Sequence, residues 1–169
     1  MNRIYFILLA VVLFSCGNPT HRKMAKNFAE VFHDEQAMLR KNNLGDDYMK
    51  VMENETPERI IYQDETMIKT SYKFSEQEEY QFTFLFTDQK LNDVFCDVFL
   101  PKIEDGQFFT EWMKKKLNAK YTYLGEEKGT ERWEKGGISV ELTNESELFE
   151  YGKVRVLYFS TPASEQLPM

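Results

Sequence analysis

Tyr80-Gln81-Phe82-Thr83-Phe84-Leu85-Phe86 places an aromatic residue at every second position, with Gln, Thr and Leu between them. Successive side chains of a β-strand point to opposite faces of a sheet, so the aromatic rings would share one face. Aromatic residues are also enriched in strands, where they fit a half-buried pleated surface. The segment therefore predicts a strand with one face buried in an apolar core.

Alternating patterns continue on both sides of this segment. They predict further strands at 59–63, 67–74, 91–100, 120–124, 131–135, 138–143 and 153–160. The connections are short, and short connections join antiparallel neighbours. Gly136-Gly137 separates two of these strands and is typical of a two-residue hairpin turn, in which both positions take positive φ.

Helical spacing of apolar residues appears before the strands and once between them. Helices are predicted over 21–43, over a shorter segment that Asp46-Asp47 can cap and that runs through Asn54, and over 106–117 with Asp105 as N-cap. We expect an α+β fold: an antiparallel β-sheet of about seven strands, with the N-terminal helices and one central helix packed on one face. The predicted order of a helix followed by a meander of strands occurs twice along the chain. The two halves of the chain that contain these repeats share no recognisable sequence pattern.

The N-terminus carries a targeting pattern. Met1-Asn2-Arg3 precedes an uncharged apolar run over 4–14, which is too short to span a bilayer and is typical of a signal peptide. Leu13-Phe14-Ser15-Cys16 resembles the lipobox of bacterial lipoproteins, with Phe14 bulkier than usual. The resemblance implies that Cys16 is alkylated by a diacylglycerol group and that residues 1–15 are removed. An ordinary secretory signal and an uncleaved anchor are the alternatives.

The expected organisation follows from this cleavage: a lipidated tether at 16–20, one domain at 21–160 and a loose tail at 161–169. No acidic residue lies between Gly17 and Lys23, which by the same resemblance favours a periplasm-facing lipoprotein of the cell envelope. The inner and outer membranes remain alternatives. The membrane would be contacted through the N-terminal lipid.

The net charge excludes one class of partner. The whole chain has a net charge of −7, and loss of Arg3 with the signal leaves 20 basic against 28 acidic residues. An acidic domain lacks the basic surface that nucleic acid requires, so no nucleic-acid partner is predicted. An envelope protein is the expected partner, and the oligomeric state is open.

No pattern of catalytic or metal-binding chemistry was found. The chain lacks the nucleophile-elbow, phosphate-loop and zinc-helix motifs, so neither a catalytic residue, a metal nor a cofactor is predicted. With Cys16 acylated, Cys96 has no disulfide partner and is expected to be a buried apolar residue. His33-Asp34-Glu35 would diverge on a helix. Acidic residues in predicted turns are interpreted as solvated: Glu76, Glu78, Glu79, Glu126, Glu127, Glu145 and Glu147.

Trp133, Arg132, Tyr121 and Tyr123 are the candidate binding residues, because aromatic and Arg side chains dominate protein interfaces. The alternative is that Trp133 and the tyrosines pack into the core. Three functions stay open: a protein-binding or accessory module, an inhibitor or immunity-type lipoprotein, and a small-ligand carrier or enzyme. The second predicts an acidic patch around an aromatic residue, and the third a cavity between helix and sheet lined by phenylalanines.

Overall fold

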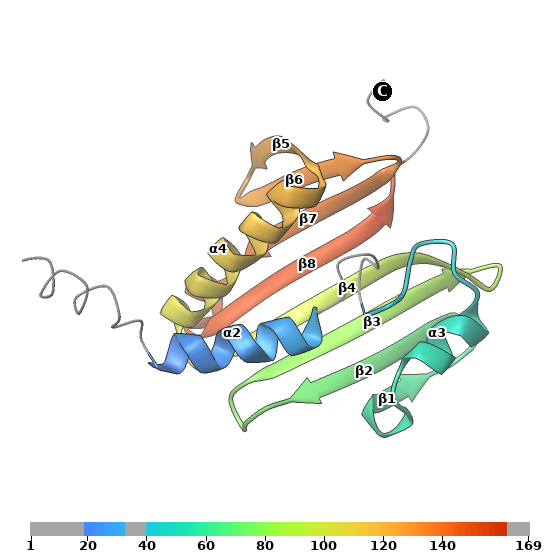
Figure 1. Cartoon of the computed structure of the whole chain (residues 1–169), viewed down its shortest axis with the longest axis horizontal. Coiled ribbons are helices and arrows are strands. Elements are labelled where there is room, and N and C mark those ends of the chain that lie inside the picture. Colours follow the sequence, from blue (N-terminus) through green and yellow to red (C-terminus); the bar gives the residue numbers. More distant parts are fainter. Residues whose placement is uncertain (1–18, 33–39, 162–169) are drawn as a thin grey trace, which may run out of the picture.

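The computed structural model describes residues 19–32 and 40–161, which form one antiparallel sheet with helices packed against it (Figure 1). The helices are α2 (Pro19–Val31), α3 (Tyr48–Asn54), the 3-10 helix η1 (Pro57–Arg59), α4 (Ile103–Lys120) and α5 (Ser146–Phe149). The strands are β1 (Ile60–Gln63), β2 (Met67–Lys73), β3 (Glu79–Thr87), β4 (Lys90–Leu100), β5 (Thr122–Glu127), β6 (Thr130–Lys135), β7 (Ile138–Asn144) and β8 (Gly152–Ser160). The expected α+β class with an antiparallel sheet is confirmed.

The sheet contains eight strands in the order β1-β2-β3-β4-β8-β7-β6-β5. The stated total of about seven strands was therefore one too low, although each of the eight observed strands overlaps a predicted segment, with 59–63 and 120–124 forming the edge strands β1 and β5. Gly136 and Gly137 have φ of 59° and 79° and form the predicted hairpin turn between β6 and β7.

The last two strands of each four-strand meander pair in the same register. Phe82 pairs with Cys96 in β3 and β4, and Leu142 pairs with Val156, each sixty residues further along the chain, in β7 and β8. β4 pairs antiparallel with β8, so the two meanders meet at the centre of the sheet. The helix-and-meander order seen in the sequence is thus a structural repeat about this central pair of strands.

One face of the sheet carries the core. Tyr80 and Phe82 of β3 are fully buried, as the alternating pattern predicts. Phe28 of α2 lies 4.8 Å from the ring of Phe109 in α4 and 6.0 Å from the ring of Tyr80. Both helices therefore cover the same aromatic face, and each buried ring removes a large apolar area from water.

The opposite face of the sheet is half-buried and mixed in polarity. Phe95 and Leu157 are cross-strand neighbours at the β4–β8 junction. Beside them, Asp97 accepts a hydrogen bond from Arg155 Nε at 2.9 Å and another from Lys153 Nζ. Helices α2, α3 and α4 all lie on the other side (Figure 1).

Two predicted helices have the wrong boundaries. α2 ends at Val31 rather than at 43, and Arg40 and Lys41 have φ of 52° and 71°, which an α-helix does not allow. His33-Asp34-Glu35 lies outside the described residues. α4 begins at Ile103, because the Lys102 carbonyl accepts hydrogen bonds from the backbone N–H groups of residues 105 and 106. Asp105 is consequently a buried residue of the first turn and not the N-cap.

Candidate functional site

The predicted binding residues around Trp133 do not gather on one surface. Trp133 is fully buried, and its Nε1 donates a hydrogen bond to Asn118 Oδ1 at 2.7 Å. The adjacent Arg132 is exposed and pairs with Glu127 at 2.8 Å and Glu141 at 3.0 Å. The indole ring is therefore a core group, as the alternative interpretation holds, and it does not face a partner.

The two tyrosines differ from each other. Tyr121 is half-buried against the core, whereas Tyr123 is exposed on the edge strand β5, with its ring 5.3 Å from that of Trp133. β5 has a register shift between Tyr123 and Gly125 and ends with Glu126 and Glu127. Bulges and charges are the usual protection of a sheet edge against strand pairing. This edge is thus poorly suited to bind another strand.

Among the described residues, the phenylalanines between the helices and the sheet pack against one another. Phe82, Phe84 and Phe109 are fully buried, and the ring of Phe32 lies 5.8 Å from the rings of both Phe82 and Phe109. A carrier or enzyme of the expected kind would need a cavity lined by these phenylalanines. Their rings contact one another instead, in a packed core.

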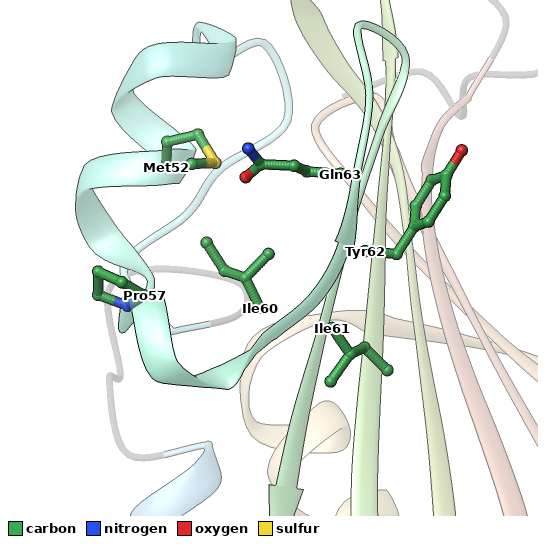
Figure 2. A pocket seen from close by; sticks show the side chains of 6 residues that line it. All are labelled: Met52, Pro57, Ile60, Ile61, Tyr62 and Gln63. Atoms are coloured by element: carbon green, nitrogen blue, oxygen red, sulfur yellow. The ribbon is translucent and has the colours of Figure 1, made fainter.

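An open groove lies at the other edge of the sheet, between β1 and the α3–η1 segment. It has a volume of about 520 Å³ (Figure 2). Met52, Pro57, Ile60 and Gln63 face this space, and Ile61 and Tyr62 project from the opposite side of the strand in Figure 2. The chain reverses direction through η1, so the helix and the strand form the two walls.

The edge strand β1 exposes unusual apolar area for its length. Ile61 is 56% exposed and Tyr62 is 49% exposed. A register shift between Ile60 and Tyr62 adds one residue to the strand, and such a bulge brings two consecutive side chains to one side. Within the described residues β1 pairs only with β2, so its outer N–H and C=O groups are open to another strand.

Tyr62 is oriented by the turn that follows it. Its hydroxyl donates to Asp64 Oδ2 at 2.6 Å, while Asp64 Oδ1 accepts from the Thr66 backbone N–H at 2.8 Å. These hydrogen bonds, that of Tyr62 first, lower the pKa of Asp64 to about 2. The same carboxylate raises the pKa of Tyr62. At neutral pH the protonated hydroxyl of Tyr62 therefore donates to the ionised carboxylate of Asp64. This hydrogen bond holds the Tyr62 ring at the edge of the sheet.

Exposed acidic residues are close in sequence to the residues that line the groove. They are Glu53, Glu58, Asp64 and Glu65, while the basic residue Lys69 pairs with Tyr62 across the strands. Arg59 lies among them, but its guanidinium stands 5.0 Å from the ring centre of Tyr72. The surroundings of the groove therefore favour a positively charged partner.

A buried carboxylate fixes the α3 wall of the groove. Glu55 accepts hydrogen bonds from Asn42 Nδ2 at 3.0 Å, Tyr72 OH at 2.8 Å and Arg40 Nε at 3.3 Å. The Arg40 guanidinium also lies 3.8 Å from the ring centre of Tyr72. Because a buried charge is tolerated only when it is paired, this network ties the loop and the end of α3 to β2.

Sequence reasoning missed the burial of several acidic residues, among them Glu55 and Glu78. Nothing in the local sequence distinguishes Glu55 from its exposed neighbours Glu53 and Glu58. Glu78, interpreted as a solvated turn residue, is buried and accepts from Asn27 Nδ2 at 2.8 Å and Tyr80 OH at 3.1 Å. Its partner Asn27 lies in α2, so no signal near Glu78 could have shown the contact.

Comparison with known proteins found no matching family model, no matching curated protein and no matching solved structure. Among the described helices, none is both long and apolar enough to cross a membrane. In residues 19–32 and 40–161, no group of three or more His, Cys, Asp or Glu side chains is placed to hold a metal ion.

Proposed function

We propose that this chain is a lipid-anchored protein-binding module of the bacterial envelope, which holds a partner by pairing an extended segment of it with β1. One observation carries the proposal: the edge strand β1, whose outer side has no partner strand among the described residues, exposes Ile61 and Tyr62 beside an apolar groove. An exposed apolar edge strand of a β-sheet can pair with a strand of another chain, so proteins normally protect such edges with charges or bulges. Both edge strands contain a register shift, but β5 ends with Glu126 and Glu127, whereas β1 contains no charged residue.

Strand addition explains how the groove would be used. Main-chain hydrogen bonds to the open edge of β1 would provide affinity, and alternate side chains of the bound segment would provide specificity. One set would enter the groove between Met52, Pro57 and Ile60, and the other would lie beside Ile61 and Tyr62. The acidic surroundings favour Lys or Arg on either side of the apolar residues of the partner.

The anchoring half of the proposal rests on the lipobox. Leu13-Phe14-Ser15-Cys16 supports removal of residues 1–15 and diacylglycerol attachment at Cys16. Two acyl chains make attachment stable, whereas one would leave it reversible. The absence of acidic residues directly after Cys16 supports a periplasm-facing position.

An inhibitor or immunity-type lipoprotein is the second candidate. The observation that favours it is the acidic setting of Tyr62, which has Asp64 at hydrogen-bonding distance and the exposed Glu58 and Glu65 nearby in the sequence. Both candidates use the same surface. They differ in the partner, which would here be a toxin or hydrolase whose activity is lost on binding.

Capture with matched edge variants tests the proposal. The mature chain from residue 16, carrying Cys16→Ser, is immobilised and exposed to detergent-solubilised envelope extract at low and moderate salt. One stoichiometric protein, released as salt rises, is expected. Ile61→Lys should weaken its binding by about tenfold or more, since loss of an interface hot spot costs about 2 kcal/mol. Leu124→Lys, on the similarly exposed edge β5, should leave binding unchanged.

Hydrogen exchange then localises the contact. Amides of β1 should become protected when the captured protein is bound. Equal capture by wild type and Ile61→Lys would place the interface elsewhere. Capture of a second copy alone would indicate edge-to-edge dimerisation. No capture at either salt by the folded chain would argue for a small ligand or an enzymatic role.

A further inference from the structure

A second exposed apolar pair lies far from the groove. Leu148 is 82% exposed and Phe149 is 48% exposed, in the short helix α5 between β7 and β8. Leu148 is the most exposed large apolar side chain of the described residues. The ring of Phe149 lies 5.8 Å from Tyr151, whose ring lies 6.4 Å from Phe99, so an aromatic row continues from the tip onto the sheet.

Direct contacts place α5 at the end of the molecule where α2 begins. The ring of His21 stacks on Phe108 of α4 at 4.3 Å, and His21 Nε2 lies 3.6 Å from Asp105 Oδ1. The next residue, Gly106, is packed so closely on α5 that an added Cβ would lie 2.2 Å from Ser146 Oγ. Figure 1 shows the starts of α2 and α4 at one end of the domain, and the close packing of Gly106 on Ser146 places α5 at the same end.

The proposed lipid is close to this end by chain length alone. Only Gly17 and Asn18 separate Cys16 from Pro19, the first residue of α2. A fully extended chain advances at most about 3.3–3.6 Å per residue, so Cys16 is within roughly 11 Å of the start of α2. A diacyl group on Cys16 would therefore hold the α2–α4–α5 end against the bilayer surface.

We propose that Leu148 and Phe149 insert into the lipid interface and act as a second membrane contact, which orients the domain. The inference rests on the proposed lipidation of Cys16. Apolar and aromatic side chains are favoured at the boundary between headgroups and acyl chains. Glu147 and Glu150 flank the pair, so insertion relies on apolar burial and suits zwitterionic lipids better than anionic ones.

This orientation has a consequence for partner binding. Figure 1 shows α3 and β1 at the opposite end of the long axis from the start of α2. With Leu148 and Phe149 at the bilayer, the groove between α3 and β1 points away from the membrane, where an extended segment of another protein can reach it.

Site-specific labels measure the orientation. An environment-sensitive fluorophore is attached at Leu148→Cys or, as a control of similar character, at Met49→Cys in α3, which is also exposed. Cys96 is buried and does not compete for the label. The lipidated protein is placed in phosphatidylcholine vesicles with or without brominated acyl chains. The emission at 148 should shift to the blue and be quenched, the emission at 49 should do neither, and adding Phe149→Glu to Leu148→Cys should reduce the quenching.

A second tether separates failure of this inference from failure of the lipid assignment. The chain from residue 17 with an N-terminal histidine tag is held on vesicles containing nickel-chelating lipid, so natural lipidation is not needed. Quenching at 148 and not at 49 supports the membrane contact whatever Cys16 carries. Quenching at neither position, or equally at both, overturns it.

Discussion

Asp97 is the charged residue at the centre of the uncovered sheet face. Burial raises its pKa, but hydrogen bonds from Arg155 and Lys153 outweigh burial, so the pKa lies below its usual value. A carboxyl with a lowered folded pKa stabilises the protein above its unfolded pKa of about 3.9, and this stability is lost as pH falls through the folded value.

We expect Asp97→Asn to lower the free energy of unfolding at pH 7 by about 1–3 kcal/mol, the range for a lost hydrogen-bonded charge. The difference from wild type should begin to shrink as pH falls below about 4 and should vanish below the lowered folded pKa of Asp97. Denaturant unfolding at steps between pH 7 and pH 2 measures both. Asp93→Asn is the control on the same strand: burial raises the pKa of Asp93, so its loss should not destabilise the protein at pH 7. Parallel pH profiles for wild type and Asp97→Asn would contradict the assignment.

At the residue scale, the sequence predicts which side chains are buried only where apolar residues recur at regular spacing along a short segment. The alternation over 80–86 predicts the inward face of β3, and the structure confirms it for each aromatic residue there. Glu55 and Glu78 are buried because of Arg40, Asn42, Tyr72 and Asn27, which come from other elements. Burial of a charge through distant partners leaves no trace in the residues around it.

Gly152 shows how one element constrains another. It begins β8 beside Leu100, and a Cβ at this position would lie 2.6 Å from the Lys102 carbonyl oxygen and 2.7 Å from Leu100 Cβ. Neither atom belongs to a flexible side-chain end, so the clash can be relieved only by moving the β4–α4 connection. In the sequence Glu150-Tyr151-Gly152-Lys153, this glycine resembles an ordinary turn residue.

Gly152→Ala should therefore destabilise the fold by roughly 1–3 kcal/mol, the usual cost of overpacking. Thermal and denaturant unfolding measure the change. Ser160→Ala, at the exposed end of the same strand, should stay within about 0.5 kcal/mol of wild type. An unfolding midpoint for Gly152→Ala equal to that of Ser160→Ala would show that the connection moves at little cost.

Strands were more predictable than helices for a physical reason. A strand with one buried face repeats every two residues, so even nine residues of β3 display several periods. The helix limits depend on distant contacts and on backbone geometry, as at Arg40 and Lys41, where positive φ excludes the predicted helix. The groove at β1 was missed for a related reason, because it needs η1 to return the chain beside α3.

At the scale of the whole molecule, the two exposed apolar pairs lie at opposite ends of one rigid sheet. Ile61 and Tyr62 border the groove, and Leu148 and Phe149 belong to α5, which packs against Gly106 near the start of α4. The filled core between helices and sheet provides the stiffness that keeps these ends apart. A membrane contact at one end and strand addition at the other would make the domain a spacer that presents a bound segment at a set height above the bilayer.

That arrangement depends on Cys16, and cysteine usage makes the dependence testable. Only Cys16 lies in the lipobox, and Cys96 is buried in β4. Cys16→Ser should leave the precursor unlipidated with residues 1–15 attached, whereas Cys96→Ala should be processed as wild type. Mass spectrometry of the N-terminal peptide distinguishes the forms, because the diacylglycerol adds a large apolar mass to residue 16. A mature chain that begins with an unmodified Gly17, or with a free thiol at Cys16, would remove the anchor and with it the reason for Leu148 and Phe149 to meet a bilayer. The groove at β1 would remain the proposed binding site, because the residues that line it all lie between Met52 and Gln63.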